Sequence, residues 1–216
     1  MALVSAVVSA HNEEEHIAGC LESIMSQTAP IDEIIVINDR STDRTVAIAT
    51  EYPVDIYDVE YGNTYLVKRT GICVAMNDTV LSIDGDTRIA PDFLERGIRR
   101  LEEGYDVASG KVYSQGRTPL GDFAAWMCNI LPKSLWSSGP AYVLNRRAYI
   151  DVCKVKRING FVDVCVGEDE IPIQRMSLIK DPDMVLWTDL PSTGQKRMIL
   201  GARVSMAAIT ALRLLP

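Results

Sequence analysis

Three groups of acidic side chains stand next to apolar stretches of this 216-residue sequence. In one of them, Asp84 and Asp86 flank Gly85 directly after the run TVLSI. The glycine lets the backbone turn, so that two carboxylates that would alternate sides in a strand converge on one cation. Mg²⁺ or Mn²⁺ suits such a sparse oxygen set, because these ions keep water and take further ligands from phosphates. The pattern predicts a divalent-metal site, with a surface turn as the alternative.

The other two acidic groups offer hydrogen-bond acceptance and proton transfer. Asp39 follows the apolar run IIVI, where it can accept hydrogen bonds from a ligand or form an Asx turn before the next helix. Ser41 and Asp43, in the same turn, are predicted to cap that helix. In the run GEDEI, Asp169 is our choice of general base opposite a metal-bound diphosphate. The alternative there is a helix start that favours carboxylates through its dipole.

Strand and helix patterns alternate along the first half of the chain. In chain order they predict strands at 4–10, 33–37, 54–59 and 79–83, and helices at 17–25, 43–51 and 65–76. Asn12 or a neighbouring residue is available to cap the first helix. Nearly continuous apolar strands that alternate with helices indicate an α/β protein with a parallel sheet covered on both faces. Ligands bind such sheets at the carboxyl ends of the strands, which is where Asp39 and Asp84 fall.

The second half of the chain is less regular and is punctuated by prolines. Its patterns predict helices at 93–103 and 120–131 and strands at 106–113 and 141–144. No internal repeat or low-complexity linker separates the two halves. We therefore expect one domain over residues 1–216, with a regular ligand-binding half and a loop-rich second half on the same core.

Composition and charge narrow the class of protein. Hydrophobic residues make up 47% of the chain and charged residues 24%, as in globular proteins with a core of their own. A formal charge of −7 argues against nucleic acid as a partner. Five cysteines without a close pair suggest a reducing compartment. The apolar residues 2–10 lack a preceding basic region and no apolar run reaches about 18 residues, so we expect no signal peptide, no membrane span and a cytoplasmic location.

The last part of the chain is basic and amphipathic. No acidic residue follows Asp189, whereas basic residues stand at Lys196, Arg197, Arg203 and Arg213. Drawn as a helix, residues 198–216 have a wide apolar arc beside a basic edge. This pattern fits a final helix packed on the core, and it also fits a peripheral contact with anionic lipid.

The motifs together resemble one family of enzymes. The runs VVSAHNEEEHIAGCLESIMSQ, EIIVINDRSTDRTVAIA, LSIDGDTRIAPDFL and GEDEIPIQRM resemble, in order and spacing, the inverting family 2 glycosyltransferases. The segment SGPAYVLNRRAY is similar to the one before the catalytic carboxylate in that family. The resemblance covers residues 3–178. It implies the GT-A (nucleotide-diphospho-sugar transferase) fold, with a Rossmann-like, mostly parallel central sheet and helices on both faces.

The resemblance also implies roles for individual residues. Asp39 would recognise the nucleotide base, Asp84 would lie near the ribose or metal, and Asp86 would bind the metal. Asp169 would act as the catalytic base, and Ala10 and Glu13 would lie against the nucleoside. Further candidates for diphosphate or acceptor contacts are Arg146, Arg147, Lys196 and Arg197, and Glu168 is a further candidate site residue. Residues 1–90 would then bind the nucleotide sugar, and residues 91–197 would hold the acceptor and the base.

The reaction that the resemblance implies is a single displacement that inverts the anomeric carbon. The donor would be a nucleotide-diphosphate sugar, with a UDP-sugar favoured and a GDP-sugar next, and Mn²⁺ or Mg²⁺ would be the cofactor. The acceptor would be a hydroxyl of a glycan, protein or lipid, or a lipid phosphate. One alternative is a catalytically silent nucleotide-sugar-binding module. Another is a sugar-phosphate nucleotidyltransferase, although the place of its Gly-rich loop is taken here by HNE at residues 11–13.

Overall fold

The computed structural model describes residues 2–116, 119–130, 140–152, 156–158, 161–163 and 176–189. Four predicted site residues lie outside the described residues, namely Glu168, Asp169, Lys196 and Arg197. The basic segment 198–216 lies outside them as well.

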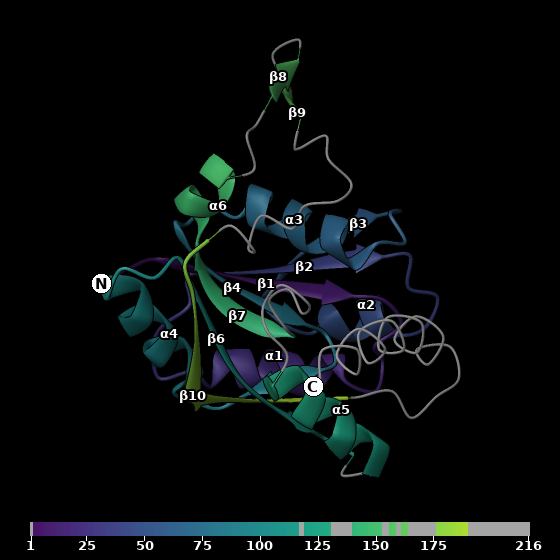
Figure 1. The fold of residues 1–216 in the computed structure, drawn as a ribbon. Coiled ribbons are helices and arrows are strands. Elements are labelled where there is room, and N and C mark those ends of the chain that lie inside the picture. Colours follow the sequence, from purple (N-terminus) through teal and green to yellow (C-terminus); the bar gives the residue numbers. More distant parts are fainter. Residues whose placement is uncertain are drawn as a thin grey trace, which may run out of the picture.

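A mostly parallel sheet forms the centre of the molecule. Its strands are β1 (Val4–Ala10), β2 (Glu33–Asp39), β3 (Asp55–Val59), β4 (Thr79–Asp84), β5 (Thr87–Ile89), β6 (Val107–Ser114), β7 (Ala141–Asn145) and β10 (Leu178–Thr188). They lie in the order β3-β2-β1-β4-β7-β6-β10-β5 (Figure 1). Strands β7 and β5 run antiparallel to their neighbours, and the other strands share one direction. A separate short pair joins β8 (Lys156–Ile158) to β9 (Phe161–Asp163).

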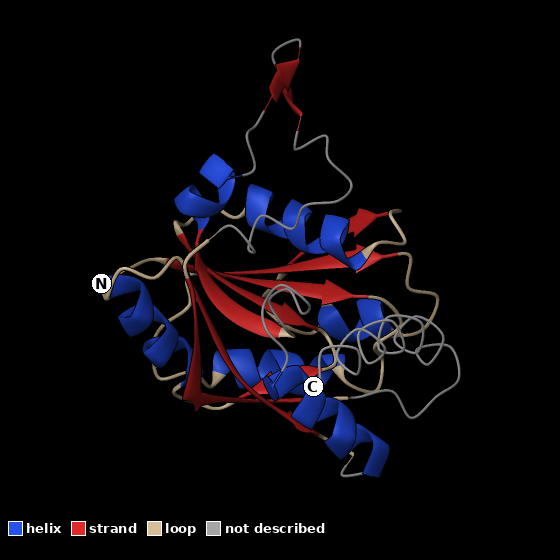
Figure 2. Cartoon of the chain, in the orientation of Figure 1, coloured by secondary structure: helices blue, strands red, loops and turns tan. Residues whose placement is uncertain are grey.

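Helices cover both faces of the sheet, as predicted (Figure 2). They are α1 (Ile17–Met25), α2 (Thr45–Ala49), α3 (Thr64–Val74), α4 (Phe93–Glu102), α5 (Pro119–Ile130) and α6 (Arg146–Val152). Successive residues of β1 serve different faces, because side chains alternate along a strand. Ala6 and Val8 belong to one hydrophobic cluster with residues of α1 and α4, whereas Val7 belongs to another with residues of α3. The two hydrophobic clusters confirm the layered α/β architecture.

The described elements match most of the predicted ones, but β5, β8, β9, β10 and α6 were not predicted. Strand β10 contains Pro182, and its pairing with β6 shifts register between Lys180 and Val185. Proline has no N–H to donate to a sheet and is tolerated at such irregularities. The proline therefore obscures the strand pattern in the sequence.

Neither Asn12 nor the residue that directly precedes the first helix, His16, caps that helix through its side chain. Helix α1 begins at Ile17, five residues after Asn12, and His16 precedes it without a side-chain cap. Asn12 has a φ of 55° and its side-chain oxygen accepts a hydrogen bond from the Thr42 amide at 2.8 Å. Asn12 therefore joins the loops that follow β1 and β2 at the carboxyl edge of the sheet.

Two helical glycines give a matched test of the packing. A Cβ on Gly71, in α3, would overlap the buried Val7 of β1, whereas a Cβ on Gly19, in α1, would overlap only the guanidinium of the exposed Arg88. We expect Gly71→Ala to lower the free energy of unfolding by about 1–3 kcal/mol through overpacking. Gly19→Ala should be near neutral, because Arg88 can swing away and alanine favours a helix by about 1 kcal/mol. Urea unfolding measures both, and equal effects would contradict the described packing.

An ion pair between the buried carboxylate of Asp181 and the partly exposed guanidinium of Arg100 joins β10 to α4. Asp181 is 2% exposed, and its carboxylate accepts hydrogen bonds from the Asp183 amide at 2.9 Å and from Arg100 Nε at 2.8 Å. Burial alone would raise the pKa of Asp181, but the Asp183 amide and the Arg100 guanidinium outweigh it and hold the pKa below its ordinary value.

This pair predicts a pH-dependent stability. Because the pKa of Asp181 is depressed in the folded state, its stabilisation is present above the unfolded pKa of about 3.9 and is lost as pH falls through the folded value. Asp181→Asn should therefore unfold more easily than the wild type at neutral pH, with a difference that shrinks below about pH 4. Urea unfolding across pH checks this, with the exposed Asp183→Asn as control. A difference that stayed constant with pH would contradict it.

Candidate functional site

Asp39 ends β2 and is held in a defined position. It is 5% exposed, its Oδ1 accepts a hydrogen bond from the Tyr61 amide at 2.9 Å, and Arg40 Nε lies 3.4 Å from the same oxygen. The side chain of Asp39 thus contacts the loop after β3, and an Asx turn is not its role. The residue that bonds to the local turn is instead Asn38. Its side-chain oxygen accepts a hydrogen bond from the Ser41 amide at 3.3 Å.

Asp43 orders the loop that leads into α2. Its carboxylate accepts hydrogen bonds from the amides of Thr45 at 2.9 Å and Glu14 at 3.1 Å. Burial alone would raise the pKa of Asp43, but bonds from Thr45 and Glu14 outweigh it and lower the pKa. Asp43 therefore bonds to the first residue of α2, but the capping position predicted for it is taken by Arg44, which makes no side-chain cap. Ser41 differs from its predicted capping role, since its hydroxyl accepts from the Asn12 amide at 3.0 Å.

The carboxylates of the predicted metal motif lie between β1, α3 and β10. Asp84 Oδ1 accepts hydrogen bonds from Ser9 Oγ at 2.7 Å and from Lys68 Nζ at 2.8 Å. Asp86 Oδ1 accepts from the hydroxyls of Thr87 and Thr188, each at 3.2 Å. Groups from other elements therefore orient each carboxylate. This orientation determines the direction in which its remaining lone pairs can bind a cation.

Gly85 has a different role from the one expected. Positive φ occurs at Gly62 and Gly104 among the described glycines, so Gly85 turns without the left-handed conformation. A Cβ at Gly85 would lie 3.2 Å from both Glu13 Cγ and the carbonyl oxygen of Ser9. Glycine suits this position because the turn packs closely against Ser9 and Glu13.

Ala10 and Glu13 lie at this same edge of the sheet. Ala10 is the buried last residue of β1 and lies opposite Asn38 in the register. Glu13 is 8% exposed, and its amide donates to Thr45 Oγ1 at 2.7 Å. Its side chain borders Gly85. The structure therefore brings Ala10, Glu13 and the motif with Asp84 together.

The negative charges of these carboxylates affect the pKa of the Cys20 thiol. Cys20 is buried in α1, and its Sγ lies 3.5 Å from the backbone oxygen of Asp84. Burial raises the pKa of the thiol well above its ordinary value, and the negative charges of Asp86, Asp84 and Glu13 raise it further. Three predicted site carboxylates thus act on one buried atom, which itself stays a neutral thiol at physiological pH.

Lys68 is a site residue that the sequence analysis missed. Its ammonium is mostly buried, is paired with Asp84, and lies 5.8 Å from the centre of the Tyr142 ring. Burial alone would lower the pKa of Lys68, but Asp84 outweighs it and raises the pKa, so the lysine remains charged. A lysine within the helical run YLVKRT gives no sign of burial. Only the packing of α3 against β1 and β2 places it beside Asp84.

These side chains fit a divalent cation of the sparse kind that the sequence predicts. Asp84 and Asp86 supply hard oxygen ligands, as Mg²⁺ and Mn²⁺ prefer. Within the described residues, no cluster of three or more histidine, cysteine or acidic side chains is arranged to hold a metal. A cation held here would therefore take its other ligands from water and from a bound molecule such as a diphosphate.

Arg146 and Arg147 lie away from these carboxylates. They follow β7, which pairs antiparallel with β4 so that Asn145 is opposite Thr79, at the far end of β4 from Asp84. Arg146 donates to the backbone oxygens of Ile72 and Cys73 at the end of α3, each at 2.8 Å. Arg147 is paired with Asp78 at 2.6 Å. The structure gives both arginines local roles at the opposite edge, so neither is placed to contact a diphosphate beside Asp84.

Comparison with known proteins identifies the family. The family model described as "Glycosyl transferase family 2" matches residues 5–150, and this chain belongs to that family. The putative glycosyltransferase EpsH of Bacillus subtilis is 34% identical over 130 residues, which cover 56% of this chain and 38% of EpsH.

Solved structures show the same fold. S. aureus TarS 1–349, in complex with UDP-GlcNAc, matches 90% of this chain and 60% of its own with a TM-score of 0.65 and 18% identity. The mannosyltransferase PcManGT of Pyrobaculum calidifontis, in complex with GDP-Man and Mn²⁺, matches all of this chain and 65% of its own with a TM-score of 0.63 and 20% identity. This confirms the GT-A fold.

The chain is shorter than the proteins it resembles. It spans about two fifths of the length of EpsH and less than two thirds of TarS 1–349 and PcManGT. Among the described residues, no helix combines the length and apolar character that crossing a membrane requires.

Proposed function

We propose that this chain transfers a sugar from a nucleotide-diphosphate sugar to an acceptor, with inversion at the anomeric carbon. The observation that carries the proposal is the gathering of Glu13, Asp39, Asp84 and Asp86 at the carboxyl edge of the sheet. That edge is where parallel α/β sheets bind ligands. Because this chain belongs to glycosyl transferase family 2, the role that we propose for these residues is to bind a nucleotide-diphosphate sugar.

The donor would lie along this edge from β2 to β4. Asp39 is buried and held by the Tyr61 amide, so it offers a fixed acceptor to the donor groups of a base. Ala10, at the end of β1, has a small side chain, and the nucleoside would lie beside it. A UDP-sugar is the favoured donor and a GDP-sugar the next. TarS has been solved with UDP-GlcNAc and PcManGT with GDP-Man, so both bases occur among proteins of this fold.

Asp86, with Asp84 beside it, would hold Mn²⁺ or Mg²⁺. When bound, the cation would neutralise the negative charge that gathers on the departing nucleoside diphosphate. Asp84 already balances the ammonium of Lys68, so Asp86 would be the main metal ligand of the protein. Thr188 and Thr87 would keep the Asp86 carboxylate turned toward the metal.

Asp169 would take the proton from the acceptor hydroxyl. As the acceptor oxygen forms its bond to the anomeric carbon, the bond from that carbon to the diphosphate oxygen breaks, and the nucleoside diphosphate leaves with the electron pair. The assignment of Asp169 rests on its motif GEDEI, since this residue lies outside the described part of the chain. The acceptor would be a glycan, protein or lipid, and the basic segment 198–216 would suit a lipid acceptor if it contacts an anionic membrane surface.

The proposal is tested by the release of nucleoside diphosphate. Purified protein is incubated with UDP-, GDP- and dTDP-sugars in Mn²⁺, and the released diphosphate is measured over time. We expect release from one donor class, slow with water as acceptor, and none without metal. Tight donor binding without release would support the catalytically silent module instead. In a parallel reaction with a nucleoside triphosphate and a sugar 1-phosphate, formation of a nucleotide sugar with release of pyrophosphate would support a nucleotidyltransferase.

A further inference from the structure

The metal motif lies where the interior of the sheet leads to its edge. Asp86 stands between β4, an interior strand, and β5, which is the last strand in the order and has three residues. Strand β5 pairs with β10 through Thr87, Arg88 and Ile89. Because so short an edge strand makes few backbone hydrogen bonds, the position of Asp86 depends on bonds that reach it from other elements.

Two such bonds end on the backbone oxygen of Asp86. One comes from the amide of Asp189, just after β10, at 3.2 Å. The other comes from Nε2 of Gln115, just after β6, at 2.9 Å. In the sheet, β10 lies between β6 and β5. The Gln115 side chain therefore reaches past the end of β10 to bond with the residue that precedes β5.

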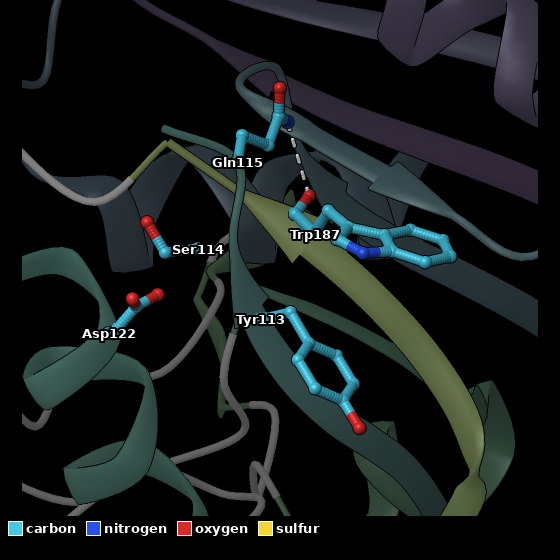
Figure 3. Close-up of a pocket in the computed structure, with 5 residues that line it drawn as sticks. All are labelled: Tyr113, Ser114, Gln115, Asp122 and Trp187. Carbon is cyan, nitrogen blue, oxygen red and sulfur yellow. Dashed lines mark hydrogen bonds between the residues drawn. The ribbon is translucent and has the colours of Figure 1, made fainter. Parts of the chain in front are cut away.

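The side-chain amide of Gln115 has a defined orientation. Besides Asp86, its Nε2 donates to the backbone oxygen of Trp187 at 3.2 Å, a bond that Figure 3 shows as a dashed line. A side-chain amide has two N–H donors, so one donor is available for each of these oxygens. The reverse orientation would place the amide oxygen against two carbonyl oxygens. The backbone amide of Gln115 adds a third bond, to the Thr188 oxygen at 3.0 Å.

These bonds support the Asp86 carboxylate in two ways. The bond from Gln115 Nε2 holds the backbone carbonyl of Asp86, next to the carbon that carries the carboxylate side chain. The bond from the Gln115 amide holds Thr188, whose hydroxyl donates to Asp86 Oδ1 at 3.2 Å. A displacement of Gln115 would therefore shift the carboxylate together with the hydroxyl that orients it.

We propose that Gln115 is a positioning residue that keeps Asp86 directed toward the metal. The inference rests on the proposed sugar transfer, in which Asp86 holds Mn²⁺ or Mg²⁺, and it adds a residue that the sequence motifs did not include. Groups that orient a metal ligand contribute about 10- to 100-fold to metal affinity. Metal affinity should therefore fall when the donors of the Gln115 side chain are removed, although these donors do not coordinate a cation.

Mn²⁺ binding by Gln115→Met tests this inference. Methionine removes the two donors and keeps an unbranched side chain of similar length. The full chain is titrated with Mn²⁺ in the presence of whichever of UDP, GDP and dTDP the wild type binds, and electron paramagnetic resonance measures the free ion. We expect the Kd for Mn²⁺ to rise about tenfold or more. A Kd within about twofold of the wild type would overturn the inference.

Gln27→Met is the matched control. Gln27 Nε2 also donates to two backbone oxygens, those of Ser23 at 3.0 Å and Ala90 at 2.8 Å, and Ala90 follows β5 at the end away from the metal motif. Its Oε1 also accepts from the Leu94 amide at 2.9 Å, so this variant should melt at least as early as Gln115→Met. Its Kd for Mn²⁺ should match the wild type. Equal increases in both variants would indicate a general loss of structure and would overturn the positioning role.

The same titrations keep this inference apart from the proposed function. If the wild type binds none of the three nucleotides with Mn²⁺, the proposed function fails, and the role of Gln115 fails with it. If the wild type binds and Asp86→Ala does not, while Gln115→Met binds Mn²⁺ as the wild type does, only the role of Gln115 fails.

Discussion

Asp86→Ala is expected to weaken Mn²⁺-dependent nucleotide binding by about a hundredfold or more. Replacing groups that only orient a metal ligand costs about 10- to 100-fold in metal affinity, and loss of the ligand itself should cost at least as much. Asp84 should replace it poorly, because its charge is already balanced by Lys68, which with Ser9 holds Asp84 Oδ1. Titration of the nucleotide with Mn²⁺ by calorimetry measures the loss.

Asp78→Ala is the matched control for this experiment. Asp78 immediately precedes β4, whereas Asp86 follows it, and Asp78 is paired with Arg147 at the opposite edge of the sheet. The control should bind nucleotide as the wild type does. If Asp86→Ala also bound normally in Mn²⁺, the metal would be held elsewhere and the assignment of this motif would be refuted.

Asp169→Asn is expected to lower the rate of transfer by about 10²- to 10⁴-fold, the usual contribution of a general base. The asparagine keeps the size of the side chain but cannot accept the acceptor proton. Because Asp169 is not assigned a donor contact, the Kd for the nucleotide should stay within about twofold of the wild type. Single-turnover transfer and nucleotide calorimetry on the same preparation separate the two quantities.

The neighbouring carboxylate provides the control for the base. Glu168→Gln removes a charge one residue away and should leave most of the transfer rate. If Glu168→Gln caused the large loss and Asp169→Asn did not, the base would be Glu168. If neither variant slowed transfer, the motif GEDEI would not supply the base at all.

Much of the fold could be predicted because its strands are simple in sequence. Strands β1, β2 and β4 are nearly continuous apolar runs followed by polar turns. This pattern is typical of buried parallel strands. Strand β10 could not be recognised in this way, since Pro182 interrupts it and its burial alternates irregularly. The partner of Asp86 on that strand, Thr188, was therefore missed as well.

Site residues could be predicted where they stand at the end of a strand. They could not be predicted where they lie on a helix or are distant in the sequence from the rest of the site. Asp39 and Asp84 were found because they follow strands directly. Lys68 was missed, because its burial beside Asp84 depends on how α3 packs. Arg146 and Arg147 were placed at the site by resemblance alone, and the antiparallel direction of β7 puts them at the opposite edge.

The central claim is that the carboxyl edge of the sheet binds a nucleoside diphosphate through a metal. The most direct test is a calorimetric titration of the wild type and of Asp39→Ala with UDP, GDP and dTDP, each with and without Mn²⁺. We predict that one nucleotide binds the wild type, only with Mn²⁺, and that Asp39→Ala weakens this binding. Absence of binding by all three nucleotides, or binding that depends on neither Mn²⁺ nor Asp39, would contradict the claim.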